Sequence, residues 1–232
     1  MTLLDAPSTE DLTDDVLADL NAKFERSSAG DIVEWAVERF YPHLCLTASM
    51  TDAVLIDVAT RVEPAIEVVF IDTGYHFPET LETLEEVRRR YGLNLRIMTV
   101  PRHPVPLWKS DPVNCCTPAK LAQLERALVG KKAWMSGLRR EESESRRGAP
   151  IVTRDRRGLV KLNPLANWAD LDVQGYIADH DVPVNPLLRK GYPSIGCWPC
   201  TRPVVAGEHS RAGRWAGLEK TECGLHDEVI AK

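Results

Sequence analysis

Residues 44–74 read LCLTASMTDAVLIDVATRVEPAIEVVFIDTG, and this stretch decides the fold. Two short apolar runs, residues 44–48 and 67–71, have the length and composition of buried strands. Residues 52–62 between them carry apolar side chains at helical spacing. A strand, a helix and a second strand in this order predict a right-handed βαβ unit with parallel strands.

The alternation continues along the chain. A helix is expected over residues 78–91, because Pro78 suits its first turn and Gly92 its end. Further segments predict strands at 95–100 and 133–136, a helix at 118–128, a hairpin of 151–153 with 159–162, and a helix from Asp170 to about His180. We therefore expect an α/β fold, with a mostly parallel sheet covered by helices on both faces and a mobile C-terminal tail.

The residues before this region predict two helices. Ser8 or Thr9 is a candidate cap for the first, and Asp31 for the second. The aromatic residues of these helices are interpreted as packing residues.

Composition excludes several classes of function. The chain has 232 residues, 44% of them hydrophobic, and a formal net charge of −5. This charge argues against a general nucleic-acid binder. Apolar runs are too short to span a bilayer, and the N-terminus lacks the features of a secretory signal. We expect a cytoplasmic protein with reduced thiols, no membrane and no nucleic-acid partner.

Four of the six cysteines form two pairs, Cys115-Cys116 and Cys197-x-x-Cys200. Such pairs occur in zinc sites, redox dithiols and iron–sulfur clusters. Neighbouring α-carbons are only about 3.8 Å apart, so an adjacent pair is strained as a chelate of one ion. A [4Fe–4S] cluster takes four thiolates, each on a different metal atom. We favour the cluster; zinc, and unligated thiols or disulfides, remain alternatives.

The ends of the predicted strands should line one crevice, since ligands of α/β sheets bind beyond the carboxyl ends of the strands. Candidate binding residues there are Ser49, Asp72, Gly74, Gly137 and Arg139. The turn at Ser49 lacks the glycines of a phosphate loop. Asp72 suits nucleoside recognition, but a capping role in the turn explains it as well.

Basic residues follow these strand ends and recur near the C-terminus. Arg139, Arg140, Arg146 and Arg147 lie in one loop, and Arg211 and Arg214 in the tail. Guanidinium groups suit phosphate and sulfate oxygens, although a solvated surface is an equal explanation for the loop. Lys120 lies one turn into a helix whose positive end faces the cysteine pair, where it can serve a cluster or an anionic substrate.

Cys223 stands apart from both pairs, in a polar, glycine-containing tail with His226 three residues away. Exposed thiols near basic groups gain thiolate character and become nucleophiles. Cys45 lies in an apolar strand and is interpreted as a core residue. Cys223 is therefore the candidate reactive thiol.

Together these motifs resemble the assimilatory adenylyl-sulfate (APS) reductases, the iron–sulfur branch of the phosphoadenylyl-sulfate (PAPS) reductase family. The likeness is carried by Cys115-Cys116 with Lys120, by GCWPCTRP (196–203), GRW (213–215) and ECGLH (222–226), and by IDTGYHFPET (71–80) and GLRR (137–140). It extends from about residue 40 to the C-terminus. The turn at Ala48-Ser49-Met50-Thr51 departs from the family's usual Ser-Gly or Ser-Phe-Gly pattern.

The resemblance implies a fold like that of the adenine nucleotide alpha hydrolases. Together with the two helices predicted before it, we expect three regions: N-terminal helices (1–40), an α/β nucleotide- and cluster-binding domain (41–200) and a C-terminal catalytic tail (201–232). It also implies thioredoxin-dependent reduction of APS to sulfite and AMP, in which Cys223 forms an S-sulfocysteine. A similar dithiol donor is an alternative to thioredoxin. Lys120, Arg211, Arg214 and His226 are implied to surround the phosphosulfate, and Cys115, Cys116, Cys197 and Cys200 to hold a [4Fe–4S] cluster.

Other functions remain open. A PAPS reductase performs the same chemistry on a substrate with an additional 3′-phosphate. A tRNA-thiolating enzyme also joins such a sheet to cysteine pairs, but it should carry a glycine-rich ATP loop. A non-enzymatic iron–sulfur sensor would not need the motif around Cys223. The sequence leaves the oligomeric state open, a homo-oligomer included.

Overall fold

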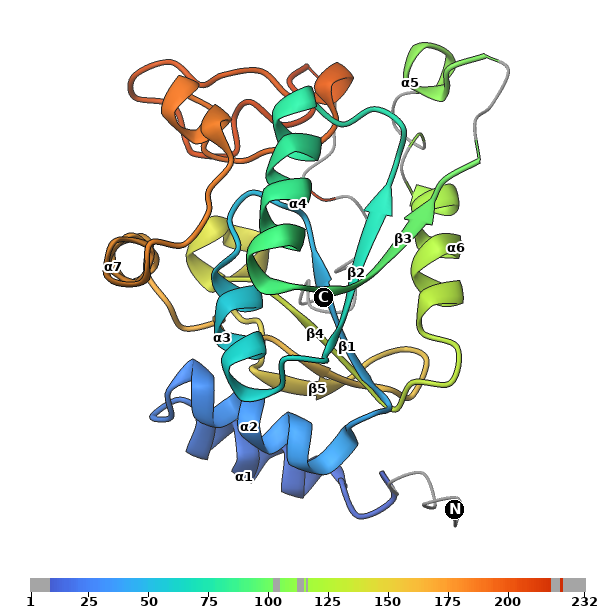
Figure 1. The fold of residues 1–232 in the computed structure, drawn as a ribbon, viewed down its shortest axis with the longest axis vertical. Helices are drawn as coiled ribbons and strands as arrows, with labels where there is room; N and C mark the ends of the chain where they lie inside the picture. Colours follow the sequence, from blue (N-terminus) through green and yellow to red (C-terminus); the bar gives the residue numbers. More distant parts are fainter. Residues whose placement is uncertain (1–8, 102–104, 112–114, 116, 218–221, 223–232) are drawn as a thin grey trace.

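A single mixed sheet organises the chain (Figure 1). The computed structural model describes residues 9–101, 105–111, 115, 117–217 and 222. The strands are β1 (Leu44–Ala48), β2 (Glu67–Asp72), β3 (Asn94–Thr99), β4 (Ala133–Ser136), β5 (Val152–Arg154) and β6 (Val160–Leu162). Their order is β3-β2-β1-β4-β6-β5, with parallel pairing except between β5 and β6. The predicted mostly parallel sheet and its hairpin are confirmed.

Helices cover both faces of the sheet, as expected. The described helices are α1 (Asp14–Phe24), α2 (Ala29–Phe40), α3 (Val54–Val62), α4 (Pro78–Tyr91), α5 (Leu107–Ser110), α6 (Thr117–Ala127) and α7 (Asp170–His180). Side chains of α1 to α4 and α7 share one large core with the sheet. Side chains of α6 pack against the opposite face. The division predicted at residues 40/41 and 200/201 stays a prediction.

The alternation of side chains in β1 explains these two layers. Leu44 and Leu46 join the core with α2 and α3, while Cys45 between them faces α6. Successive residues of a strand point to opposite faces, so a strand buried on both sides must be apolar throughout. Burial raises the pKa of the Cys45 thiol to about 12. Cys45 is therefore a core residue, as predicted.

The caps of the first two helices differ from the sequence prediction. Thr13, rather than Ser8 or Thr9, caps α1 by accepting a hydrogen bond from the Val16 amide. Ser28 caps α2, and Asp31 is its reciprocal partner in a capping box. Asp31 was wrongly predicted as the cap because an acid suits either position of this motif.

The chain after α7 returns to the end of the sheet toward which β2 points (orange to red in Figure 1). It includes two short 3₁₀ helices, η3 (Pro186–Lys190) and η4 (Trp198–Cys200). This return places the second cysteine pair above the carboxyl ends of the strands.

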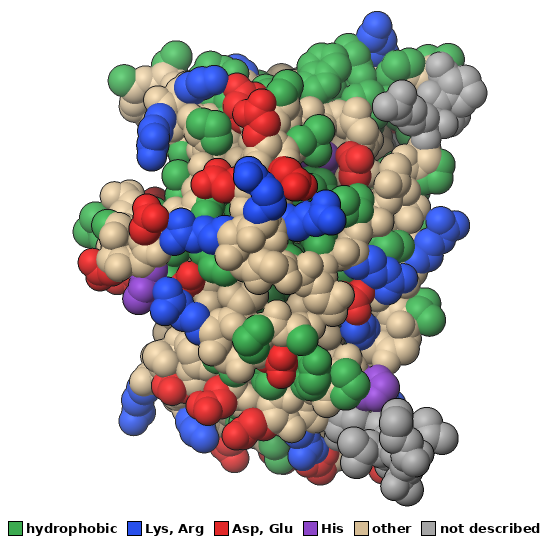
Figure 2. All heavy atoms as spheres, in the orientation of Figure 1, with side chains coloured by type: hydrophobic (Ala, Val, Ile, Leu, Met, Phe, Trp, Pro, Cys, Tyr) green, Lys and Arg blue, Asp and Glu red, His purple; other side chains and the backbone are tan. Residues whose placement is uncertain are grey.

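The surface shown in Figure 2 carries acidic and basic side chains interspersed, without a continuous field of one sign. Among the residues that the structure describes, no helix is long and apolar enough to cross a membrane.

Candidate active site

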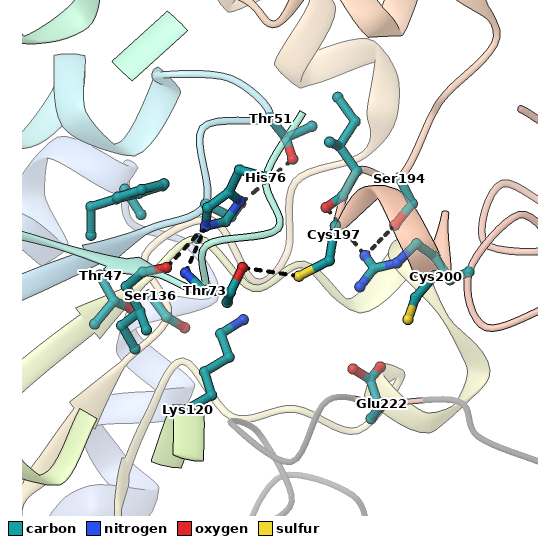
Figure 3. A pocket seen from close by; sticks show the side chains of 18 of the residues that line it. Thr47, Thr51, Thr73, His76, Lys120, Ser136, Ser194, Cys197, Cys200 and Glu222 are labelled. Atoms are coloured by element: carbon teal, nitrogen blue, oxygen red, sulfur yellow. Dashed lines mark hydrogen bonds between the residues drawn. The ribbon is translucent and has the colours of Figure 1, made fainter. Parts of the chain in front are cut away.

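A cavity of about 640 Å³ opens beyond the carboxyl ends of β1, β2 and β4. Its wall is completed by α6, by residues 193–200 and by Arg211, Arg214 and Glu222. Figure 3 shows Lys120, Cys197, Cys200 and Glu222 around one open space. Segments far apart in sequence therefore converge at the crevice that the strand order predicts.

The loop after β2 holds the second cysteine pair in place. His76 and Cys197 form an antiparallel bridge, and the Trp198 amide donates to the Tyr75 carbonyl at 2.9 Å. The Thr73 hydroxyl lies 3.1 Å from the Cys197 sulfur. At this distance the hydroxyl and the sulfur form a hydrogen bond, so Thr73 fixes the direction of the Cys197 side chain.

Cys115 of the first cysteine pair lines the same cavity. Cys115 lines it together with Cys197 and Cys200, and α6 begins two residues later, so its electropositive end lies near the thiols. Cys116 lies outside the described residues. Within the described ranges, no three His, Cys, Asp or Glu side chains group closely enough to hold a metal ion. Nevertheless, three of the four expected cluster ligands line one cavity, and thiols are the donors that iron–sulfur clusters use.

Arg214 lies flat between a glycine and an aromatic ring. Its guanidinium carbon is 4.4 Å from the centre of the Trp215 ring, and its Nη1 donates to Ser194 Oγ and the Ile195 carbonyl at 3.2 Å each. A β-carbon on Gly196 would lie only 2.5 Å from Arg214 Nη2. Arg214 Nε is buried and has no hydrogen-bond partner among the described residues. Gly196 is therefore the residue that lets this cation reach the cavity wall.

Arg146 and Arg211 both bind the carboxylate of Glu222. Arg146 donates to it from Nε at 2.8 Å and from Nη2 at 2.7 Å, and Arg211 Nη2 donates at 3.2 Å. Burial alone would raise the pKa of Glu222, but hydrogen bonds and charge from these arginines lower it. Burial and the charge of Arg146 lower the pKa of Arg211. Glu222 is therefore an ionised internal anion at this cavity.

Lys120 projects from α6 toward Thr73 and Cys197 (Figure 3). No hydrogen bond or ion pair joins its ammonium to another residue of the described ranges. Burial lowers the pKa of the nearby His76, and the charge of Lys120 adds to this effect. His76 Nε2 lies 3.1 Å from the Ile71 carbonyl. The histidine is therefore neutral near pH 7, and the positive charge on this side of the cavity belongs to Lys120.

The remaining candidates at the strand ends have different positions. Ser49, Gly74, Gly137 and Arg139 line the cavity, and Arg139 also pairs with Asp170 at 2.8 Å. Asp72 is not among the lining residues; its carboxylate accepts from the Gly74 amide at 2.8 Å. This contact corresponds to the capping alternative for Asp72.

Two candidates, Cys223 and His226, lie outside the described residues. Conversely, Thr73, Gly196 and Glu222 shape the cavity, although no role was predicted for them. A role for Glu222 and Gly196 could have been predicted from their positions, because each directly precedes a cysteine of a recognised motif, Cys223 and Cys197. Thr73 meets Cys197 across 124 positions, and no local pattern indicates such a contact.

Comparison with known proteins agrees with this geometry. The model of the phosphoadenosine phosphosulfate reductase domain matches residues 43–203. Adenosine 5'-phosphosulfate reductase of Streptomyces coelicolor is 48% identical over 214 residues, which cover 88% of this chain and 90% of that protein. Its counterpart from Mycobacterium tuberculosis is 42% identical, with 88% and 91% covered.

Solved structures give the same result for the fold. The crystal structure of PAPS reductase from Candida auris, a phosphate complex, is 29% identical, with a TM-score of 0.71 over 80% of this chain and 96% of that one. FMN adenylyltransferase of Candida glabrata, at 16% identity and a TM-score of 0.57, shares the fold alone. The cavity, the fold and these likenesses together show that the chain belongs to the phosphoadenosine phosphosulfate reductase family.

Proposed function

We propose that this enzyme reduces adenosine 5'-phosphosulfate to sulfite and AMP, with electrons from thioredoxin or a similar dithiol. One observation carries the proposal: a single cavity gathers three cysteines of the two pairs, Lys120, Arg214 and the residue that precedes Cys223. The relatives named as adenosine 5'-phosphosulfate reductases support the choice of substrate.

Cys223 is the nucleophile in this proposal. Its thiolate attacks the sulfur of the substrate, an S–S bond forms, and the S–O bond to the phosphate breaks with AMP as the leaving group. A thiolate of the donor then attacks the Cys223 sulfur and releases sulfite. The second donor thiol resolves the mixed disulfide, so the two electrons that reduce the sulfuryl group come from the dithiol.

The positive groups of the cavity serve the transferred sulfuryl group. Negative charge spreads over its non-bridging oxygens during transfer, and fixed cations stabilise that charge. Lys120 and Arg214, which both line the cavity, are the cations that we assign to this role. His226 is proposed as a third group, as the motif around Cys223 implies.

A [4Fe–4S] cluster is proposed as the cofactor, with Cys115, Cys116, Cys197 and Cys200 as ligands. When bound, it supplies structural order and an anionic charge near Lys120. The 3.1 Å contact between the Thr73 hydroxyl and the Cys197 sulfur orients this ligand. Iron and acid-labile sulfide analysis after anaerobic purification tests this assignment.

PAPS reduction is the second candidate, because the family is named for it and the Candida auris neighbour performs it. Initial rates of sulfite release with the two nucleotides, under thioredoxin and thioredoxin reductase, separate the candidates. We expect a higher kcat/KM for APS. Equal or higher efficiency with PAPS would contradict the proposed substrate, and no sulfite from either nucleotide would contradict the proposed activity.

A further inference from the structure

The Glu222 carboxylate accepts hydrogen bonds from two arginines at the cavity. The residue is only 7% exposed. Arg146 donates to both carboxylate oxygens in a bidentate arrangement, and Arg211 donates a third hydrogen bond. The hydroxyls of Ser143 and Ser145 lie 3.4 Å from Glu222 Oε1. Bidentate pairs of this kind fix direction as well as distance.

Arg146, which makes two of the three arginine hydrogen bonds to Glu222, lies outside the predicted tail, whereas Arg211 lies within it. Arg146 ends η2 (Glu144–Arg146), in the segment that follows β4, and is 8% exposed. Its third nitrogen, Nη1, binds Glu142. Arg211 is braced by Ser194 at 3.4 Å. Glu142 and Ser194 thus fix the two arginines, and the arginines in turn fix the Glu222 carboxylate.

Covalent geometry connects this anchor to the proposed nucleophile. Cys223 follows Glu222 directly, so their α-carbons are about 3.8 Å apart. We infer that Glu222 is a positioning residue of the reaction: its buried pair with Arg146 anchors the chain so that the Cys223 thiol enters the cavity. The inference rests on the proposed function and adds a division of labour among the cations.

That division follows from the contacts. All three side-chain nitrogens of Arg146 face carboxylates, Glu142 and Glu222. In this inference Arg146 holds Glu222, and its role as a substrate ligand stays a prediction. Lys120 and Arg214 remain the cations directed at the substrate. A nucleophile displaced by about 1 Å reacts about 10²-fold more slowly, so an anchor one residue away controls the rate of attack.

The test compares Glu222→Gln, Glu222→Asp and a matched control, Glu144→Gln. Glu144 pairs with Arg147 on the surface, where both side chains are 76% exposed. The rate of S-sulfo adduct formation is measured in a single turnover without donor, and APS affinity by equilibrium binding. We expect Glu222→Gln to slow adduct formation about 10²-fold. Its affinity for APS should stay within about twofold, Glu222→Asp should recover part of the rate, and the control should match wild type.

A second readout does not depend on activity. The rate of trypsin cleavage after Lys220 reports release of the chain around Glu222, and loss of a charged hydrogen bond should raise it by about 10- to 100-fold in Glu222→Gln. Unchanged cleavage in that variant would refute the anchor. Faster cleavage with a wild-type rate of adduct formation would refute the positioning role. If wild type forms no adduct from APS, both the proposed function and the positioning role are refuted. The cleavage rates then still decide whether Glu222 anchors the chain.

Discussion

Replacing Gly196 by alanine should disable Arg214 without unfolding the protein. The added β-carbon would lie 2.5 Å from Arg214 Nη2 and 2.6 Å from Cζ, where 3.4 Å is an ordinary contact. The guanidinium must therefore retreat by about 1 Å, a displacement that costs about 10²-fold in rate when the group serves the reaction. Because the clash involves the end of a flexible side chain, the backbone need not move. Loss of the stacking on Trp215 should lower the free energy of unfolding by about 1 kcal/mol.

The assay is kcat/KM for sulfite release from APS, combined with urea unfolding. Gly148→Ala is the matched control, because its β-carbon would meet nothing within 4 Å. We expect a loss of about 10²-fold in Gly196→Ala only. A Gly196→Ala enzyme with nearly wild-type kcat/KM would refute the assignment of Arg214, and a large loss of stability would refute the claim that only the side chain moves.

Three further predictions concern the fold and its charges. Asp57 accepts hydrogen bonds from Arg61, Tyr91 and Tyr176. Asp57→Ala removes the acceptor of both tyrosine hydroxyls and should lower the free energy of unfolding in urea by about 3 kcal/mol. A decrease near zero would contradict this. Burial raises the pKa of Asp57, but hydrogen bonds outweigh burial and lower this pKa from its usual value of 3.8. The stabilisation by the ionised carboxylate should therefore be complete above pH 3.8 and disappear as the pH falls through the lowered pKa. Acid unfolding of wild type and Asp57→Asn checks the sign, because the two proteins should differ less in stability at low pH. Cys45, with its pKa raised to about 12 by burial, should resist iodoacetamide at pH 8 in the native protein and react in urea, as followed by peptide mass spectrometry; native labelling would contradict its place in the core.

Local patterns were sufficient for the elements of the sheet. β1, β4 and α4 begin and end where the sequence predicts, because apolar runs and the Pro78 and Gly92 signals are local. The caps of α1 and α2 were missed because several neighbouring residues can accept the same amide hydrogen bond. The choice between them depends on one turn of backbone geometry.

The candidate site could be predicted only in part, for a different reason. Lys120, Cys197 and Arg214 were named from motifs and the family resemblance, and all three line the cavity. The partners of Glu222 were not, because Arg146 lies 76 positions away and the pair exists only in the folded chain. A contact of this kind between distant residues is not visible in a sequence pattern.

In the proposed reaction Cys223 takes the sulfuryl group from the substrate. Incubation of the enzyme with APS in the absence of any thiol donor, followed by peptide mass spectrometry, tests it most directly. We predict one added sulfonate group on Cys223, released as sulfite when thioredoxin is supplied, and no adduct in Cys223→Ser, which should retain its iron and sulfide. An adduct on another cysteine, or sulfite production by Cys223→Ser at the wild-type rate, would contradict the account.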